Sequence, residues 1–307
     1  MLMATVQTNQ RARRSAVVHW YRHLLREWVA ESRRPLLPAA ARPDPRSWSD
    51  TELTASWLGH ATVLINFFGF TIITDPVLFP RVGIRLPGFT IGPRRLTEPG
   101  LRVRDLPPID LVLLSHAHFD HFDLRTLHAL SRRADVITAP RTRDILRFTW
   151  FRSKTELRWG EDTEVRRDSG SLRVRAFEVK HWGARLRTDT YRGYNGYVLE
   201  REGRRIIFGG DTAFTRSFAD LRSREPFDLA IMPIGAYDPW IHSHATPEQA
   251  VSMADAAGAD HIMPIHHQTF RLSAEAFDEP IDRFEAALQR TPERIALRGI
   301  GETFRVR

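Results

Sequence analysis

The sequence predicts a layered α/β fold, and three observations support this prediction. Short, β-branched apolar segments bounded by Gly, Pro and Asp recur from residue 51 onward. Segments with the spacing of amphipathic helices lie between some of them. At 307 residues, 42% of them hydrophobic, the chain can build a sizeable core, which excludes wholesale disorder. Many strands with interspersed helices favour sheets whose faces are covered by helices.

Local patterns place the strands and helices. The best-marked helix covers residues 247–257, with Thr246 as N-cap, Pro247 at the first position, Gln249 completing a capping box and Gly258 as the stop. A second helix is expected over residues 279–290. The predicted strands cover residues 53–58, 61–67, 70–74, 109–115, 135–139, 171–180, 194–200, 204–209, 228–234, 261–265 and 294–298.

The first 50 residues differ from the remainder, so we predict an extension over residues 1–50 and the α/β domain over residues 51–307. Residues 15–31 carry an apolar stripe at helical spacing, with basic side chains off the stripe. Residues 33–46 contain too much Pro for a helix interior and form a Pro/Arg-rich linker. Such a basic amphipathic helix either packs on its own domain, the commoner case, or makes peripheral contact with a membrane surface.

The charge of the chain is concentrated in this extension. The net charge of +8 suggests a polyanionic partner such as nucleic acid. Residues 1–50, however, hold nine Arg against four acidic residues, so the remainder is nearly balanced. A nucleic acid is therefore a disfavoured partner, and a small-molecule or lipid substrate is expected instead.

Two absences in the sequence set limits on location and chemistry. The basic N-terminus is not followed by the apolar stretch of about 7–15 residues that marks a secretory signal, and no apolar run approaches the ~18 residues of a spanning helix. We expect a cytoplasmic chain, with membrane contact at most peripheral. There is no Cys, so a metal site must use His, Asp and Glu.

One string, SHAHFDHFD at residues 115–123, concentrates ionisable side chains directly after an apolar strand. Residues two apart on an extended segment project to the same side, so His116 and His118 can share one ion. The chain then turns into a helix, so Asp120 and His121 point elsewhere and can serve a second ion. Imidazole and carboxylate suit Zn²⁺ and related divalent metals. Helix-capping and surface histidines are the alternative, but such a cluster is costly unless it is paired or metal-bound.

Three further candidate ligands, His181, Asp211 and His266, also follow apolar strands. The carboxyl ends of strands are where open α/β sheets gather their sites. Together the seven side chains, five His and two Asp, suffice for two ions if one carboxylate bridges.

The string HAHFDH resembles the HxHxDH signature of the metallo-β-lactamase superfamily, whose fold is a four-layer αββα sandwich. Further strings resemble the branch that holds N-acyl-phosphatidylethanolamine-hydrolysing phospholipase D and the ascorbate-6-phosphate lactonases. These strings are WLGHATVLI (57–65), TDPVL (74–78), HW (181–182), FGGDT (208–212), MPIGAYDP (232–239), HATPEQA (244–250) and IHHQTF (265–270).

The resemblance implies a ligand set. One ion is implied to be held by His116, His118 and His181. The other is implied to be held by Asp120, His121 and His266, with Asp211 bridging the two. Two divalent ions are therefore expected, with Zn²⁺ first and Mn²⁺ or Fe²⁺ as alternatives.

The chain departs from the family pattern at two positions. His267 stands where the family shows a Trp, and it could compete with His266 as the ligand. Ala213 stands where a Gly usually follows the Thr of the DT string, which alters the pocket wall.

The remaining candidate residues lie near these ligands in the motifs. Asp120 and His244 are predicted catalytic residues, His244 because it occupies a position that faces the substrate in the phospholipase-like relatives; a polar loop residue is the alternative. Side chains expected in the pocket or supporting the ligands are His60, Asp75, Trp182, Tyr237, Trp240 and His267. Tight turns at His60 and Asp75, and core packing of the aromatics, are the competing interpretations.

These observations predict a binuclear metal-dependent hydrolase. By resemblance, the leading function is a phosphodiesterase of phospholipase D type, in which a metal-bound hydroxide attacks an N-acyl phospholipid or similar amphiphile. The alternative is a lactonase or ester hydrolase on a small, phosphorylated or unphosphorylated substrate. A metal-dependent nuclease is the third hypothesis, and a non-enzymatic role is the least favoured because no ligand position is substituted.

Overall fold

The computed structural model describes residues 29–86, 89–130, 132 and 134–306. The chain divides into two compact units, residues 1–37 and 38–307. In the smaller unit, residues 29–33 are helical, so most of the predicted helix over residues 15–31 lies outside the described residues. The predicted boundary fell after residue 50, whereas residues 38–50 lie in the larger unit, where the Asn66 side-chain amide donates to the Ser49 carbonyl (2.8 Å).

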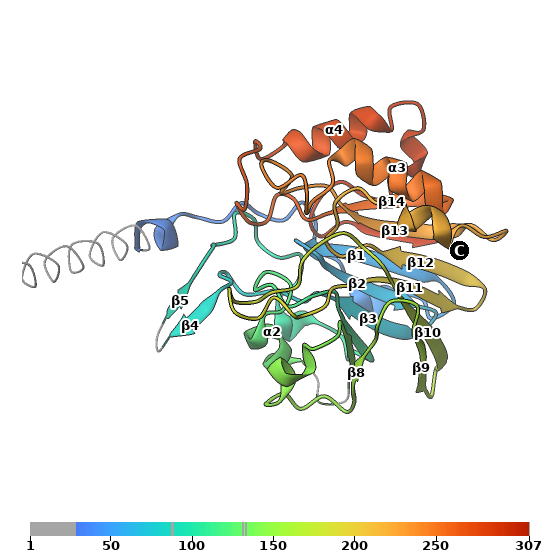
Figure 1. The fold of residues 1–307 in the computed structure, drawn as a ribbon, viewed down its shortest axis with the longest axis horizontal. Helices are drawn as coiled ribbons and strands as arrows, with labels where there is room; N and C mark the ends of the chain where they lie inside the picture. Colours follow the sequence, from blue (N-terminus) through green and yellow to red (C-terminus); the bar gives the residue numbers. More distant parts are fainter. Residues whose placement is uncertain (1–28, 87–88, 131, 133, 307) are drawn as a thin grey trace, which may run out of the picture. The chain divides into compact units, whose positions relative to one another are not determined.

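Two sheets form the larger unit in the part of the chain that the structure describes (Figure 1). The first has the order β15-β1-β2-β3-β6-β7-β8 and the second the order β14-β13-β12-β11-β10-β9. The strands of the first sheet are β1 (Leu53–Gly59), β2 (Thr62–Phe67), β3 (Phe70–Thr74), β6 (Leu111–Leu114), β7 (Asp135–Thr138), β8 (Lys154–Glu156) and β15 (Thr303–Val306). Those of the second are β9 (Asp162–Arg167), β10 (Gly170–Phe177), β11 (Gly196–Arg201), β12 (Arg204–Phe208), β13 (Phe227–Pro233) and β14 (Ala259–Ile265). A separate hairpin pairs β4 (Ile84–Leu86) with β5 (Phe89–Ile91).

Each sheet combines an antiparallel and a parallel part. The strands β3, β6, β7 and β8 are parallel in the first sheet, with Ile73 opposite Val112. In the second sheet β12, β13 and β14 are parallel, with Ile231 opposite Met263. Parallel neighbours end at the same edge, so the loops that follow them come together there.

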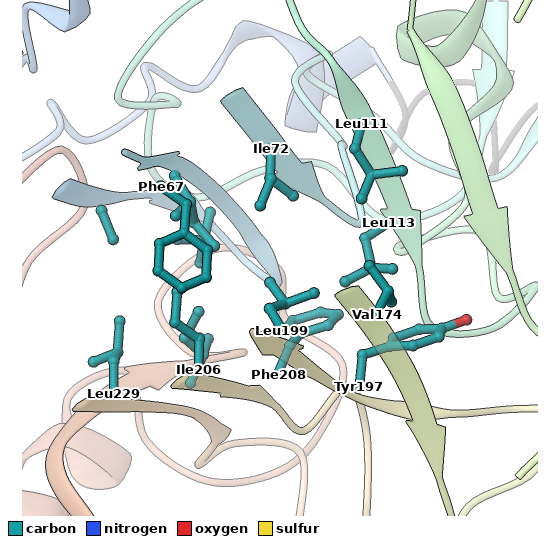
Figure 2. Close-up of a cluster of buried hydrophobic side chains, with 14 of the residues drawn as sticks. Phe67, Ile72, Leu111, Leu113, Val174, Tyr197, Leu199, Ile206, Phe208 and Leu229 are labelled. Atoms are coloured by element: carbon teal, nitrogen blue, oxygen red, sulfur yellow. The ribbon is translucent and has the colours of Figure 1, made fainter. Parts of the chain in front are cut away.

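The main core lies between the two sheets. Figure 2 shows side chains from both sheets pointing toward one another, including Phe67 and Leu113 from the first and Tyr197, Phe208 and Leu229 from the second. All five are fully buried. The central strands β2, β6 and β13 are buried along their whole length and are mostly apolar. The strands β9 and β10, toward one edge of the second sheet, instead alternate between buried and more exposed residues.

Helices cover the outer faces and complete four layers, which confirms the predicted αββα sandwich. The helices α3 (Pro247–Ala257) and α4 (Glu279–Ala287) pack on the second sheet, and α2 (Leu124–Ala129) packs on the first. Short 3-10 turns are η1 (Pro45–Ser47), η2 (Val103–Asp105), η3 (Arg143–Leu146), η4 (Arg216–Leu221) and η5 (Pro292–Arg294). The predicted capping box of α3 is confirmed, and Gly258 ends that helix in the left-handed region. Among the described residues, no helix is long and apolar enough to cross a membrane.

The predicted strand over residues 294–298 is wrong. Pro292 starts a 3-10 turn there, and Ile295 makes only an isolated bridge to Ile262 of the edge strand β14. The backbone then turns away, with Arg298 N donating to the Glu302 carboxylate. The second predicted helix is present, although it ends at Ala287 rather than at residue 290.

Candidate metal centre

The candidate ligands lie on loops that follow strands of both sheets. His116 follows β6 of the first sheet, whereas Asp211 and His266 follow β12 and β14 of the second. His266 has a backbone φ of +66°, and the nearby His60 and Asp75 have φ of +55° and +33°. Side chains other than Gly adopt this left-handed region at an energetic cost, which is often met at functional sites.

Three imidazoles meet in a first cluster. His116 Nε2 lies 2.7 Å from His118 Nδ1, and His181 Nε2 lies 3.3 Å from the same atom. Asp211 completes the group, whose four ligand atoms all lie within 4.8 Å of one another. His118 therefore reaches the cluster through Nδ1, whereas His116 and His181 reach it through Nε2.

A second cluster joins Asp120, His121 and His266 with His60, again with the ligand atoms within 4.8 Å of one another. Asp120 Oδ2 lies 3.7 Å from His121 Nε2 and 3.9 Å from His266 Nε2. His60 Nε2 lies closer, at 2.9 Å, and donates a hydrogen bond to Asp120. The two clusters have the membership that the sequence predicted for the two ions, with His60 added.

Asp211 lies between the clusters. Its Oδ2 atom is within 3.1–3.9 Å of the Nε2 atoms of five imidazoles. These belong to His116, His121, His181, His244 and His266. Asp211 Oδ2 therefore lies close to side chains of both clusters, which is the position that a bridging ligand requires.

A buried carboxylate fixes ring orientations in both clusters. Asp75 Oδ2 accepts from His121 Nδ1 at 2.7 Å and from the Ser115 hydroxyl. That hydroxyl in turn accepts from His116 Nδ1 at 2.8 Å. His181 Nδ1 donates to the Ser243 carbonyl at 2.9 Å. The Nδ1 protons of three rings are thus used elsewhere, which leaves each Nε2 lone pair directed into the site.

The residues present fit divalent cations. Several buried polar atoms of the site have no hydrogen-bond partner, namely His121 Nε2, Asp211 Oδ1 and His266 Nε2. Leaving buried polar groups unpaired costs free energy, and imidazole nitrogens facing one another at hydrogen-bond distance cannot all find donors. A cation among these lone pairs satisfies the nitrogen and oxygen donor set, which is typical of Zn²⁺.

The protonation of the site follows from burial and from Asp211. Burial lowers the pKa of His116 and His181 well below the usual value and that of His118 to about 4, so these rings are neutral. Burial also opposes ionisation of Asp211, but the neighbouring His121 and His266 hold the pKa of that carboxyl well below its usual range. Burial opposes protonation of His121, but Asp211 and Asp120 raise its pKa well above the usual value, so a metal that binds there would displace a proton.

The two predicted catalytic residues both lie at the centre. Asp120 belongs to the second cluster, and His244 Nε2 lies 3.3 Å from Asp211 Oδ2. The backbone N–H of His244 is held by the Trp240 carbonyl at 3.0 Å, while its Nδ1 has no partner. His244 is mostly buried beside the ligands, and it is not an exposed loop residue.

The side chains predicted in the pocket or as support occupy different places. Trp182 is 53% exposed and touches the His118 ring edge-on (4.3 Å between centroids), and Trp240 is 56% exposed. Tyr237 is buried, with its hydroxyl donating to Glu279 of α4 (2.8 Å), so it supports its loop. His267 stacks on Trp57 (4.5 Å) and belongs to none of the potential metal-ligating groups among the described residues.

Two residues that the sequence did not single out complete the site. Ser115 links Asp75 to His116, and a small polar residue directly before the first His of the motif was its only signal. Arg185 donates from one guanidinium nitrogen to the carbonyls of Ala117 and Phe122, each at 2.9 Å. It therefore clamps the loop that carries His118, Asp120 and His121, and no local pattern marks it.

Comparison with known proteins identifies relatives that span the centre. A family model described as a beta-lactamase superfamily domain matches residues 71–267. An uncharacterised protein of Mycobacterium tuberculosis is 32% identical over 275 residues, covering 86% of this chain and 71% of that protein. The N-acyl-phosphatidylethanolamine-hydrolyzing phospholipase D 1 of Caenorhabditis elegans is 32% identical over 256 residues, covering 77% of this chain and 70% of that enzyme.

Solved structures share the fold. The isothiocyanate hydrolase from Delia radicum gut bacteria aligns with a TM-score of 0.64 at 18% identity, covering 82% of this chain and 98% of that one. At this identity the likeness shows the architecture alone.

Proposed function

This chain belongs to the metallo-β-lactamase superfamily and is a metal-dependent hydrolase, and on that premise we propose a binuclear phosphodiesterase of phospholipase D type. Its substrate is an N-acyl phospholipid or a similar amphiphile. In this hydrolysis the water oxygen forms a bond to phosphorus, and the bond between phosphorus and the headgroup oxygen breaks. The headgroup oxygen takes up a proton and leaves as an alcohol.

The observation that carries the two-ion proposal is the position of Asp211. One carboxylate oxygen faces imidazoles of both clusters at 3.1–3.9 Å, and besides Asp211 the first cluster has three side chains and the second four. When bound, two ions at such a site supply an activated water and neutralise charge that develops on the substrate oxygens. Zn²⁺ is the metal that we propose first, since the donors are imidazole and carboxylate with no thiolate.

The protein residues hold this arrangement. His60 donates to Asp120 Oδ2, the oxygen that also faces His121 and His266, and so orients that carboxylate. Asp75 orients His121 directly and His116 through Ser115, so one buried carboxylate supports a ligand of each ion. The burial of these groups keeps bulk water from competing for the hydrogen bonds.

His244 is the group that we propose to act on the leaving oxygen. Its ring is adjacent to Asp211, and one ring nitrogen has no partner. An imidazole in this position can hold a proton at that nitrogen and donate it to the departing alkoxide. Asp120, by contrast, contributes as a candidate ligand oriented by His60.

The substrate class rests on the relatives. The Caenorhabditis elegans enzyme, 32% identical, is named for hydrolysis of N-acyl-phosphatidylethanolamine. A lactone or small ester remains the rival substrate, because a binuclear centre can also attack a carbonyl.

A turnover screen tests the proposal. The metal-loaded chain should release phosphatidic acid from N-acyl-phosphatidylethanolamine, with slower or no hydrolysis of lactones and of DNA. Asp211→Ala should abolish turnover, whereas Asp255→Ala, an exposed carboxylate on α3, should not change it. Hydrolysis of lactones alone would contradict the phosphodiesterase proposal and favour a lactonase. Full activity of the Asp211 variant would show that the reaction does not depend on this metal centre.

A further inference from the structure

A pocket of about 460 Å³ lies beside the candidate metal centre. It is lined on one side by the segment that follows β14 and on the other by Gly235 and Ala236, which follow β13. His266, whose Nε2 faces Asp211 at 3.2 Å, forms part of the lining, so the pocket adjoins the metal centre.

Hydrogen bonds hold the two sides of the pocket in place. The Glu275 carboxylate accepts from the backbone N–H groups of Ala236 and Asp238, and Ala274 N donates to the Asp238 carbonyl at 2.9 Å. A further backbone hydrogen bond ties Leu96, another lining residue, to the segment that follows β14: Leu96 N donates to the carbonyl of Thr269 at 2.7 Å. The walls are therefore fixed by backbone pairing, and the Glu275 carboxylate is occupied.

Most of the lining side chains are hydrocarbon. Leu96, Phe270, Leu272, Phe277 and Pro280 supply them. Phe270 is buried and contacts the Arg95 guanidinium (5.5 Å), whereas Phe277, 36% exposed, lies at the surface. Of the polar side chains in the lining, the Gln268 amide already donates to Asp278, so an alkyl chain would find mainly apolar walls.

One charge in the lining is free to bind a ligand. Arg271 is exposed, and no carboxylate among the described residues pairs with its guanidinium. Glu275, the acid of the same lining, is engaged by backbone N–H groups. The pocket therefore combines apolar walls with an unneutralised cation, which complements an alkyl chain that carries a phosphate or another anion.

We propose that this pocket binds one hydrocarbon chain of the substrate and that Arg271 pairs with its anionic group. The inference rests on the proposed function, because it assigns residues that select the amphiphile. Because His266 belongs both to the pocket lining and to the metal centre, a chain in the pocket would lie beside that centre.

Alkyl phosphonates test the pocket, since their C–P bond resists hydrolysis. We would titrate the metal-loaded full chain with methyl-, hexyl-, octyl- and decylphosphonate below their micellar concentrations, using calorimetry. Methylphosphonate measures binding of the head alone. Affinity should rise about fourfold for each added methylene until the pocket is filled.

Variants assign the contacts. Arg271→Gln should weaken decylphosphonate binding about tenfold, Arg271→Lys should restore most of it, and binding of uncharged decanol should not change. Arg290→Gln, at another exposed arginine without a described partner, is the matched control. Leu272→Gln should reduce the gain in affinity per methylene while leaving methylphosphonate binding unchanged.

The outcomes separate this inference from the proposed reaction. Affinities independent of chain length, or equal effects of Arg271→Gln and Arg290→Gln, would overturn the subsite even if N-acyl phospholipids are hydrolysed. Chain-length dependence with the expected variant effects would support the subsite even if no phospholipid is turned over, and would then point to another anionic amphiphile.

Discussion

Single residues around the ligands decide how well the centre is formed. Asp75 is the clearest example, because its fully buried carboxylate contacts both His121 and Ser115. Burial raises its pKa, and the hydrogen bonds from His121 and Ser115 oppose that shift. The partners therefore favour the ionised form of Asp75, and Asp75 in turn orients the His121 ring and the Ser115 hydroxyl.

We predict that Asp75→Asn weakens metal binding about 10–100-fold, because the amide is a poorer acceptor for the protons of His121 and Ser115. Competition with a chromogenic chelator measures the affinity of each ion. The comparison variant is Asp105→Asn, at an exposed position away from the centre. Equal affinities for the two variants would show that the ligand rings keep their orientation without Asp75.

The sequence predicted which side chains cluster at the centre better than it predicted the contacts that support them. The HxHxDH spacing and the strand ends mark His116, His118, Asp120 and His121 without knowledge of the fold. The contacts of Arg185 cannot be predicted in this way, because its two acceptors lie 68 and 63 residues away in the chain. The motif predicts His60 as a supporting residue but does not predict its acceptor, Asp120, which is 60 residues distant.

At the scale of elements, the loop over residues 115–123 is held from outside. Arg185 reaches it from the loop that follows His181 and stacks on Phe119 (4.0 Å). Burial lowers the pKa of Arg185 to about 10, so the guanidinium stays charged at neutral pH. A charged donor gives the two carbonyl hydrogen bonds more strength than a neutral one would.

We predict that Arg185→Ala lowers the free energy of unfolding by about 2 kcal/mol or more, since two buried carbonyls lose a charged donor. It should also weaken binding of the metals, because four candidate ligands, His116, His118, Asp120 and His121, lie on the clamped loop. Urea denaturation and chelator competition measure the two effects. Arg187→Ala, at an exposed position on the same loop, should change neither; an Arg185 variant that resembles it would contradict the clamp.

The helix α3 offers an independent prediction. Its capping box joins the Thr246 hydroxyl to the Gln249 N–H (3.3 Å), and the Gln249 side chain accepts from the Thr246 N–H (3.1 Å). Thr246→Ala should destabilise the protein by about 1 kcal/mol in urea denaturation. Ser252→Ala, exposed in the middle of the helix, should be neutral or slightly stabilising, and an equal loss in both would rule out the cap as the cause.

Element types followed from the sequence where local signals agreed with the fold. The capping box and Gly258 defined α3, and continuous apolar segments predicted the central strands. The strand β15 could not be predicted, since it forms only by pairing with β1 at the far end of the chain. The strand predicted over residues 294–298 is wrong because its local apolar pattern does not reflect strand pairing. Ile295 packs in the core and makes a single bridge to β14.

At the scale of the whole fold, the candidate centre joins the two sheets. The ligands after β6 belong to the first sheet, while His181, Asp211 and His266 follow strands of the second. Ions that bind only when these loops are together must stabilise the folded chain, because the unfolded chain offers no preformed site.

We therefore predict that metal removal lowers the melting temperature. At a free metal concentration of about 100 times the dissociation constant, one ion adds about 2.7 kcal/mol, which corresponds to a shift of about 5–10 °C for a domain of this size. Calorimetry after chelation, and again after addition of Zn²⁺, measures the shift and its reversal. Asp211→Ala should melt at the same temperature with and without metal, because it removes the oxygen that faces both clusters. A melting temperature of the unsubstituted chain that is independent of metal would mean that the two sheets are not linked through this centre.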